Sequence, residues 1–183
     1  MSETRLSEES RKALGESVRV AFRDFKDVLC LTVPVEFRWS TRMTSSAGNV
    51  RWTGASFLVK LSAPIFSHLA LEDMSEAMRG IRETMMHELC HIPDDGHKLL
   101  DHGRRWPRNV RLCGYDPASV RRHNYACGRA LYGGDRFRVD QLVEFQHRGI
   151  WVEARIIKKN VRKARVQATD GTFWSVPYSC LEG

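Results

Sequence analysis

The residues best suited to chemistry in this sequence are His87, Glu88 and His91, which form the pattern H-E-x-x-H. On an α-helix, two histidines four positions apart lie on one face, so both imidazoles can reach a single ion, and the spacing suits Zn²⁺. Glu88 lies about 100° around the helix from His87, close enough to place a carboxylate beside the metal without ligating it. The pattern therefore predicts that Glu88 is the general base for a zinc-activated water, and it indicates hydrolysis, usually of a peptide bond.

The segment before the motif has the pattern of an amphipathic helix that the motif ends. Asp73 and Glu76 have the spacing of a capping box. Apolar residues follow at helical spacing, namely Met74, Met78, Ile81, Met85 and Leu89. Such a stripe is typical of a helix that packs on a core, so this setting favours the metal interpretation over a chance match in an unrelated segment.

A catalytic zinc normally takes three protein ligands and leaves a fourth position for water, and two histidines downstream are candidates for the third. His97 follows His91 by six residues, which is the spacing of the metzincin pattern, although Asp94 stands where that pattern has glycine. His102, the second candidate, is followed by Gly103.

Three blocks of sequence carry a resemblance to a known family: His87-Glu88-Leu89-Cys90-His91, His102-Gly103-x-x-Trp106 and Gly114-x-Asp116-Pro117. Over about residues 7–130, the chain resembles the SprT-like zinc metallopeptidase family, the Spartan-related minimal zincins. The resemblance implies one zinc ion on His87, His91 and His102, with Glu88 as base, and so favours His102 over His97. The chain lacks the cysteine-rich zinc ribbon that many members carry after the catalytic part.

The elements that must position this site indicate an α+β fold. Apolar residues at three- and four-residue steps predict a helix over residues 8–28. Alternating residues predict strands over 33–39, 49–52 and 56–61, which we expect to form a small antiparallel sheet, and Pro64 is expected to open a short helical turn. An extended substrate could add to an edge of such a sheet. We assign residues 1–132 to a zincin-like domain.

A further helix is predicted over residues 118–131, and its Tyr125 is a candidate oxyanion stabiliser. Four short alternating runs then follow in residues 136–183, separated by polar turns, which predicts a small antiparallel barrel. This second module resembles a Tudor- or KOW-like barrel.

The charge of the chain favours a polyanionic partner. Lys and Arg number 29 against 22 Asp and Glu, a formal charge of +7, and such an excess favours DNA or RNA. One turn of the second module concentrates four cations that could follow a phosphate backbone, with Trp151 or Trp174 available for stacking. The four are Lys158, Lys159, Arg162 and Lys163.

Composition argues against a membrane protein and against a disulfide-rich protein. The chain has 183 residues, of which 42% are hydrophobic, and no apolar run approaches the roughly 20 residues of a membrane span. Its five cysteines are scattered and form no C-x-x-C pair, which argues against a disulfide framework or a zinc ribbon. We expect a cytoplasmic protein, monomeric and without a membrane partner.

Three hypotheses follow. The leading one is a zinc-dependent endopeptidase that hydrolyses protein substrates, including DNA-bound or nucleoprotein ones. The second is a nucleic-acid-binding adaptor whose zinc is structural or whose catalytic site is idle, and Glu88 argues against it because a structural zinc does not need a base. The third is a protein-interaction module with incidental basicity.

Overall fold

The computed structural model describes residues 6–93, 99–120 and 132–183. The chain divides into two compact units, Met1–Cys127 and Gly128–Gly183, here called the N-terminal and C-terminal units. Within the described residues, no helix is long and apolar enough to cross a membrane.

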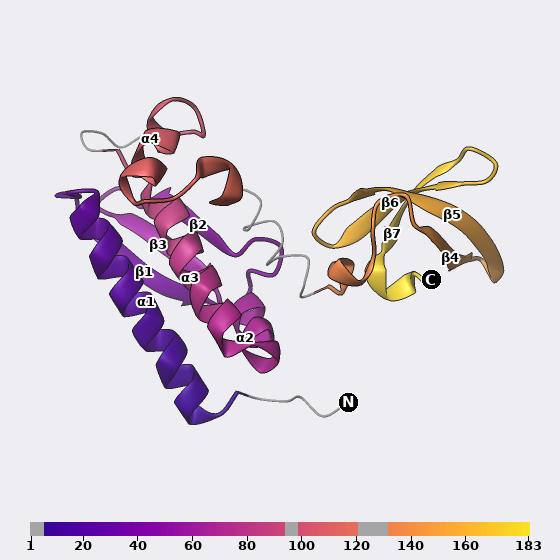
Figure 1. The fold of residues 1–183 in the computed structure, drawn as a ribbon, viewed down its shortest axis with the longest axis horizontal. Coiled ribbons are helices and arrows are strands. Elements are labelled where there is room, and N and C mark those ends of the chain that lie inside the picture. The colour runs from indigo at the N-terminus through magenta and orange to yellow at the C-terminus, as the bar shows by residue number, and fades with distance from the viewer. Residues whose placement is uncertain (1–5, 94–98, 121–131) are drawn as a thin grey trace. The chain divides into compact units, whose positions relative to one another are not determined.

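The N-terminal unit begins with helix α1, Glu8–Val28, which confirms the predicted bounds. The Ser7 side chain accepts a hydrogen bond from the backbone N–H of Ser10 and so caps the first turn. One face of α1 buries Leu14, Val18, Ala21 and Phe25 and packs on helix α3, Met74–Leu89. Arg82 of α3 bonds Asp24 at 3.1 Å and lies 4.6 Å from the centre of the Phe25 ring, which fixes the two helices side by side (Figure 1).

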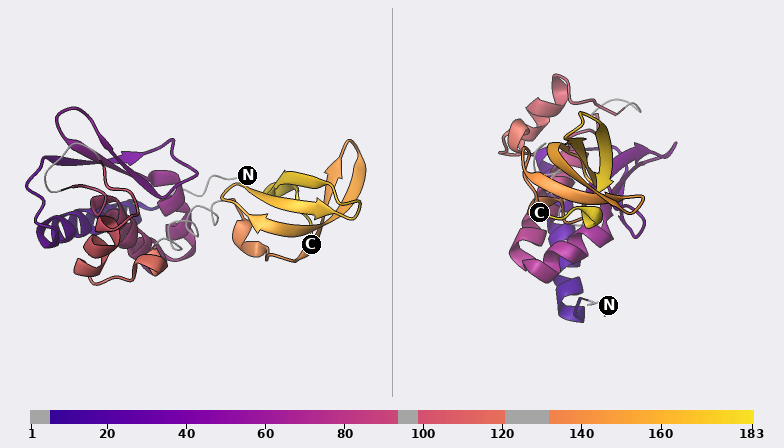
Figure 2. Two further views of the ribbon diagram at one scale, coloured as in Figure 1. Left: turned by 90° about the horizontal axis from the view of Figure 1, so that it is seen from above. Right: turned by 90° about the vertical axis from the view of Figure 1, so that its right-hand side faces the viewer.

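A three-stranded sheet lies against these helices, with strands β1 (Val35–Ser40), β2 (Gly48–Trp52) and β3 (Phe57–Ser62) in the order β1-β3-β2. The prediction of an antiparallel sheet was wrong for one pair, because β1 runs parallel to β3 while β2 runs antiparallel to it. The turn after β2 returns the chain directly onto β3, so β1 takes the far side of β3 (Figure 2). As a result β3 is central and almost wholly buried, and β2 forms an edge.

Helix α2, Ala63–Glu72, is longer than the short turn expected at Pro64. Ser62 caps it by accepting a hydrogen bond from the Ile65 N–H. Its apolar residues Ile65, Phe66 and Leu69 are buried. Helix α2 therefore contributes to the core and leads directly into α3.

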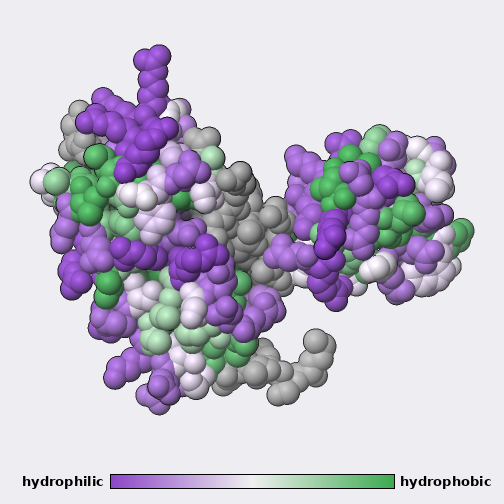
Figure 3. All heavy atoms as spheres, viewed as in Figure 1, coloured by the Kyte–Doolittle hydropathy of each residue, from purple (hydrophilic) through white to green (hydrophobic). Residues whose placement is uncertain are grey.

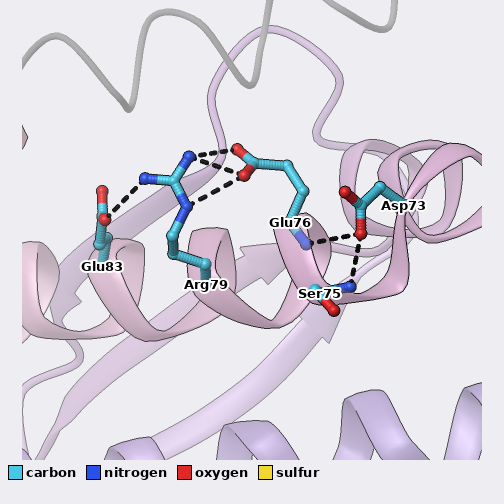
Figure 4. Close-up of polar contacts among 5 residues, drawn as sticks. All are labelled: Asp73, Ser75, Glu76, Arg79 and Glu83. Carbon is cyan, nitrogen blue, oxygen red and sulfur yellow. Dashed lines mark hydrogen bonds and ion pairs between the residues drawn. The ribbon is translucent and has the colours of Figure 1, made fainter.

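Asp73 caps α3 by accepting from the backbone N–H groups of Ser75 and Glu76 at 2.8 and 3.1 Å (Figure 4). The second half of the predicted capping box was wrong, because the Asp73 N–H bonds the Leu69 carbonyl and the Glu76 carboxylate pairs with Arg79 instead. Toward its C-terminal end α3 becomes buried on every side, from Thr84 to Leu89. The end of α3 that carries the H-E-x-x-H motif is therefore packed against other parts of the protein on every side.

The C-terminal unit is a four-stranded antiparallel sheet in the order β4-β5-β6-β7. Its strands are Leu142–His147, Ile150–Lys159, Lys163–Ala168 and Phe173–Pro177. These match the four predicted runs. Backbone bonds of 2.8 and 2.9 Å join Glu144 of β4 to Glu182, so the end of the chain returns to the first strand. One face carries a core built on Phe145, Ile156 and Tyr178. The likeness to Tudor or KOW barrels stays a prediction.

Candidate metal centre

Three imidazoles converge at the C-terminal end of α3. The Nε2 atom of His87 lies 3.2 Å from Nε2 of His91 and 3.2 Å from Nε2 of His102. A tetrahedral zinc ion with Zn–N bonds of 2.0–2.1 Å holds its ligand nitrogens about 3.3 Å apart. The donor set and its spacing therefore fit a three-histidine zinc site. His87 is buried, His91 is half-buried and His102 is exposed, so the cluster opens to solvent on the His102 side.

The orientation of His91 is fixed by the segment that follows the motif. Nδ1 of His91 lies within hydrogen-bonding distance of the Leu100 carbonyl, and the Leu100 N–H donates to the His91 carbonyl at 2.8 Å. A carbonyl that accepts from one ring nitrogen leaves the other nitrogen deprotonated and directed at the metal. This pair of bonds makes Leu100 a support for the ligand.

Trp106 forms a wall behind all three imidazoles. It is fully buried, and its Nε1–H donates to the His87 carbonyl at 3.1 Å. Its ring centre lies 4.8, 5.7 and 4.6 Å from those of His87, His91 and His102. Trp106 belongs to helix α4, Arg105–Leu112, which Asn109 also ties to the motif by donating to the Cys90 carbonyl at 3.2 Å.

His102 lies in the turn just before α4. Pro107 stands in the first turn of α4, where its missing N–H costs no hydrogen bond. Gly103 follows His102, and its N–H donates to the Asp101 carboxylate at 2.8 Å. A Cβ at this position would lie 2.6 Å from the same carboxylate oxygen, so a larger residue there would displace the exposed Asp101 side chain.

Glu88 lies beside the histidine cluster and is not one of its ligands. Its side chain is buried, and burial raises the pKa of the carboxyl to about 8, against a lowering effect of the hydrogen bond from the Val50 backbone. Val50 belongs to the edge strand β2. The structure therefore places a desolvated carboxyl against a sheet edge, on the residue that follows His87.

Gly48, at the start of β2, permits this close approach of strand and helix. A Cβ at Gly48 would stand 2.6 Å from Cγ2 of Thr84 and 2.9 Å from Cγ of Glu88. We expect Gly48→Ala to lower the free energy of unfolding by about 1–3 kcal/mol, because neither the strand nor the buried helix can easily move. Urea denaturation measures the effect.

Gly15→Ala is the matched control for this substitution. Gly15 lies inside α1 with no atom within 4 Å of a Cβ built there, so alanine should stabilise the protein by about 0.5–1 kcal/mol. A Gly48→Ala protein as stable as the wild type would show that strand and helix are not in tight contact.

The structure brings some of the sequence-predicted site residues together and leaves others apart. His87, His91 and His102 lie together, and Glu88, next to His87 in the sequence, is buried with its carboxyl against strand β2. His97 and Tyr125 lie outside the described residues, so the alternative ligand and the oxyanion stabiliser stay predictions.

Of the four predicted cations of the C-terminal unit, two are engaged within the protein. Lys159 donates to the Phe137 carbonyl at 2.6 Å, and the Arg162 Nε–H donates to the Tyr132 hydroxyl at 3.1 Å. Lys158 and Lys163 are exposed. Any nucleic-acid contact in this turn would therefore depend mainly on Lys158 and Lys163.

Sequence reasoning missed the residues that support the site from a distance. Leu100, Asn109, Val50 and Gly48 carry no pattern that links them to the motif, since each acts through a contact formed only in the fold. Trp106 was noted for its spacing from His102, but its hydrogen bond to the His87 carbonyl was not foreseen.

Comparison with known proteins found no curated protein and no solved structure that matches the chain. A model of the SprT-like family matches residues 18–126, which cover the three histidines, Glu88 and α4. The chain therefore belongs to the SprT-like family.

Proposed function

We propose that the protein is a zinc-dependent endopeptidase. The observation that carries the proposal is the convergence of three histidine Nε2 atoms beside a buried glutamate that is not a ligand. A structural zinc site is normally closed by four protein ligands, whereas a catalytic one keeps an open position. Three donors on a solvent-facing cluster match the second kind.

His87, His91 and His102 would hold the ion, and Glu88 would act as general base. Zinc bound there would lower the pKa of a coordinated water to about 7 and polarise a substrate carbonyl. Glu88 would take the proton of the attacking water and later return it to the leaving amine.

The edge strand β2 would align the substrate. An extended peptide can join a sheet edge through backbone hydrogen bonds, which asks little of its side-chain sequence. Within the described part of the chain, no strand pairs with the outer edge of β2. Because Val50 of this strand hydrogen-bonds to Glu88, a peptide along the edge would pass the general base.

Nucleic acid is the partner that we propose for the C-terminal unit, so that DNA-bound or nucleoprotein substrates are brought to the peptidase. Residues 136–183 carry nine Lys and Arg against five Asp and Glu. Trp151 is 50% exposed and could stack on a base, whereas Trp174 is half-buried and packs on Phe145 and His147.

Removal of the metal tests the peptidase proposal. We expect the chelated protein to lose hydrolysis of an unfolded protein substrate and to regain it with one equivalent of zinc per chain, since the ion supplies the electrophile. Full hydrolysis by metal-free protein would overturn the proposal. Nucleic-acid binding with no cleavage by the zinc-loaded protein would favour the adaptor alternative.

A further inference from the structure

Helix α4 has two faces with opposite roles. Trp106 and Val110 are buried and point toward the metal centre and core. Arg104, Arg108 and Arg111 are exposed, and their spacing of four and three residues places them in one row on the outer side of the helix, over about 10 Å. In the space-filling view, the region over α4 is strongly hydrophilic (Figure 3).

The charge of this arginine row is not compensated locally. The segment 102–115 contains four arginines and no acidic residue. The acidic residue that precedes this segment in the sequence, Asp101, accepts a hydrogen bond from the Gly103 N–H. Within the described parts of the chain, Arg104, Arg108 and Arg111 form no ion pair. Arg104 stands at the helix N-terminus, where the helix dipole favours anions, so this arginine does not stabilise the helix.

A hollow of about 270 Å³ adjoins the arginine row. Arg108 and Arg105 line one part of it, and the other lining is largely apolar: Leu29, Pro93, Leu100 and Leu112, with Asn109. The hollow is slightly smaller than typical small-molecule sites, so it fits one group of a larger ligand. A ligand that suits both features has an anionic chain with planar, partly apolar groups attached.

We propose that the arginine row of α4 binds the phosphate backbone of single-stranded nucleic acid, with one unstacked base in the adjoining hollow. Guanidinium groups bind phosphates through charge-assisted hydrogen bonds. Duplex DNA keeps its bases stacked and cannot offer one to the hollow. Arg104 lies two residues after the proposed ligand His102, so nucleic acid on this row would lie beside the metal centre. That this centre is a peptidase site rests on the proposed function.

Fluorescence anisotropy with a labelled oligothymidine tests the proposal on the full-length, zinc-loaded protein. We expect R104Q/R108Q/R111Q to weaken binding at least about 10-fold and to reduce the slope of log affinity against log salt by about 2, because three phosphate contacts are lost. The triple Arg→Lys variant should keep most of the affinity, since backbone contacts depend on charge.

The matched control removes the same charge from another exposed helix. K12Q/R19Q/R23Q on α1 should bind within about twofold of wild type, because long-range charge is screened beyond roughly 10 Å at 0.1 M salt. Equal losses in the two Gln variants, or wild-type binding by the α4 variant, would overturn the proposal. Equal affinity for a duplex of the same length would overturn the assignment to single strands.

Zinc content and hydrolysis of an unfolded protein free of nucleic acid separate this proposal from the peptidase one. The R104Q/R108Q/R111Q variant should keep one zinc per chain and wild-type hydrolysis of that substrate, since these three side chains are exposed and none belongs to the histidine cluster. If the wild type binds as expected but never hydrolyses, the peptidase proposal fails and the nucleic-acid surface stands. If the wild type hydrolyses the substrate but the α4 variant binds nucleic acid normally, the peptidase proposal stands and the nucleic-acid surface on α4 fails.

Discussion

Glu88→Gln is expected to keep its zinc and to lose hydrolysis. The amide is nearly isosteric, so the helix and the three histidines should stay in place, but it cannot accept a proton from water. Removal of a general base typically costs about 10²–10⁴-fold in rate, and kcat/KM on an unfolded protein substrate should fall by that amount.

Glu76→Gln is the matched control on the same helix. Glu76 pairs with Arg79 at 2.6 Å near the start of α3, eleven residues before His87, and its substitution should leave kcat/KM within about twofold because such helix pairs contribute little. A Glu88→Gln protein that hydrolyses at the wild-type rate would contradict the assigned base. Loss of zinc from this variant would instead make Glu88 a residue that positions the ligands.

His102→Ala should abolish stable zinc binding, whereas His97→Ala should not. Loss of a group that merely orients a ligand costs about 10–100-fold in metal affinity, so loss of one of three direct ligands should exceed about 100-fold. Competition with a colorimetric chelator measures the zinc affinity of both variants. Zinc loss from the His97 variant, with normal binding by the His102 variant, would reverse the assignment.

Local pattern was sufficient for helices α1 and α3 and for the core of the site. The bounds of α1 followed from apolar spacing, which is a property of one segment. The H-E-x-x-H spacing likewise is a property of one helix. The third histidine required the downstream block His102-Gly103-x-x-Trp106, and the structure places this histidine within 3.2 Å of His87.

The features that sequence did not supply depend on contacts between distant segments. Alternation indicates a strand but not its direction, so the parallel pairing of β1 with β3 was missed. A register shift between Ile156 and Lys158 places Lys158 opposite the exposed Arg165 and Lys159 opposite the buried Ala164. Because successive side chains of a strand point to opposite faces, these two adjacent lysines have different surroundings, which charge counting could not predict.

X-ray absorption at the zinc edge of the zinc-loaded wild-type protein tests the central claim most directly. A three-histidine site with one open position predicts three imidazole nitrogens and one oxygen at roughly 2.0–2.1 Å and no sulfur. Cys90 stands inside the motif, but its sulfur lies 3.6 Å from that of Met86. A zinc–sulfur distance of about 2.3 Å, or a protein that takes up no zinc, would contradict the account.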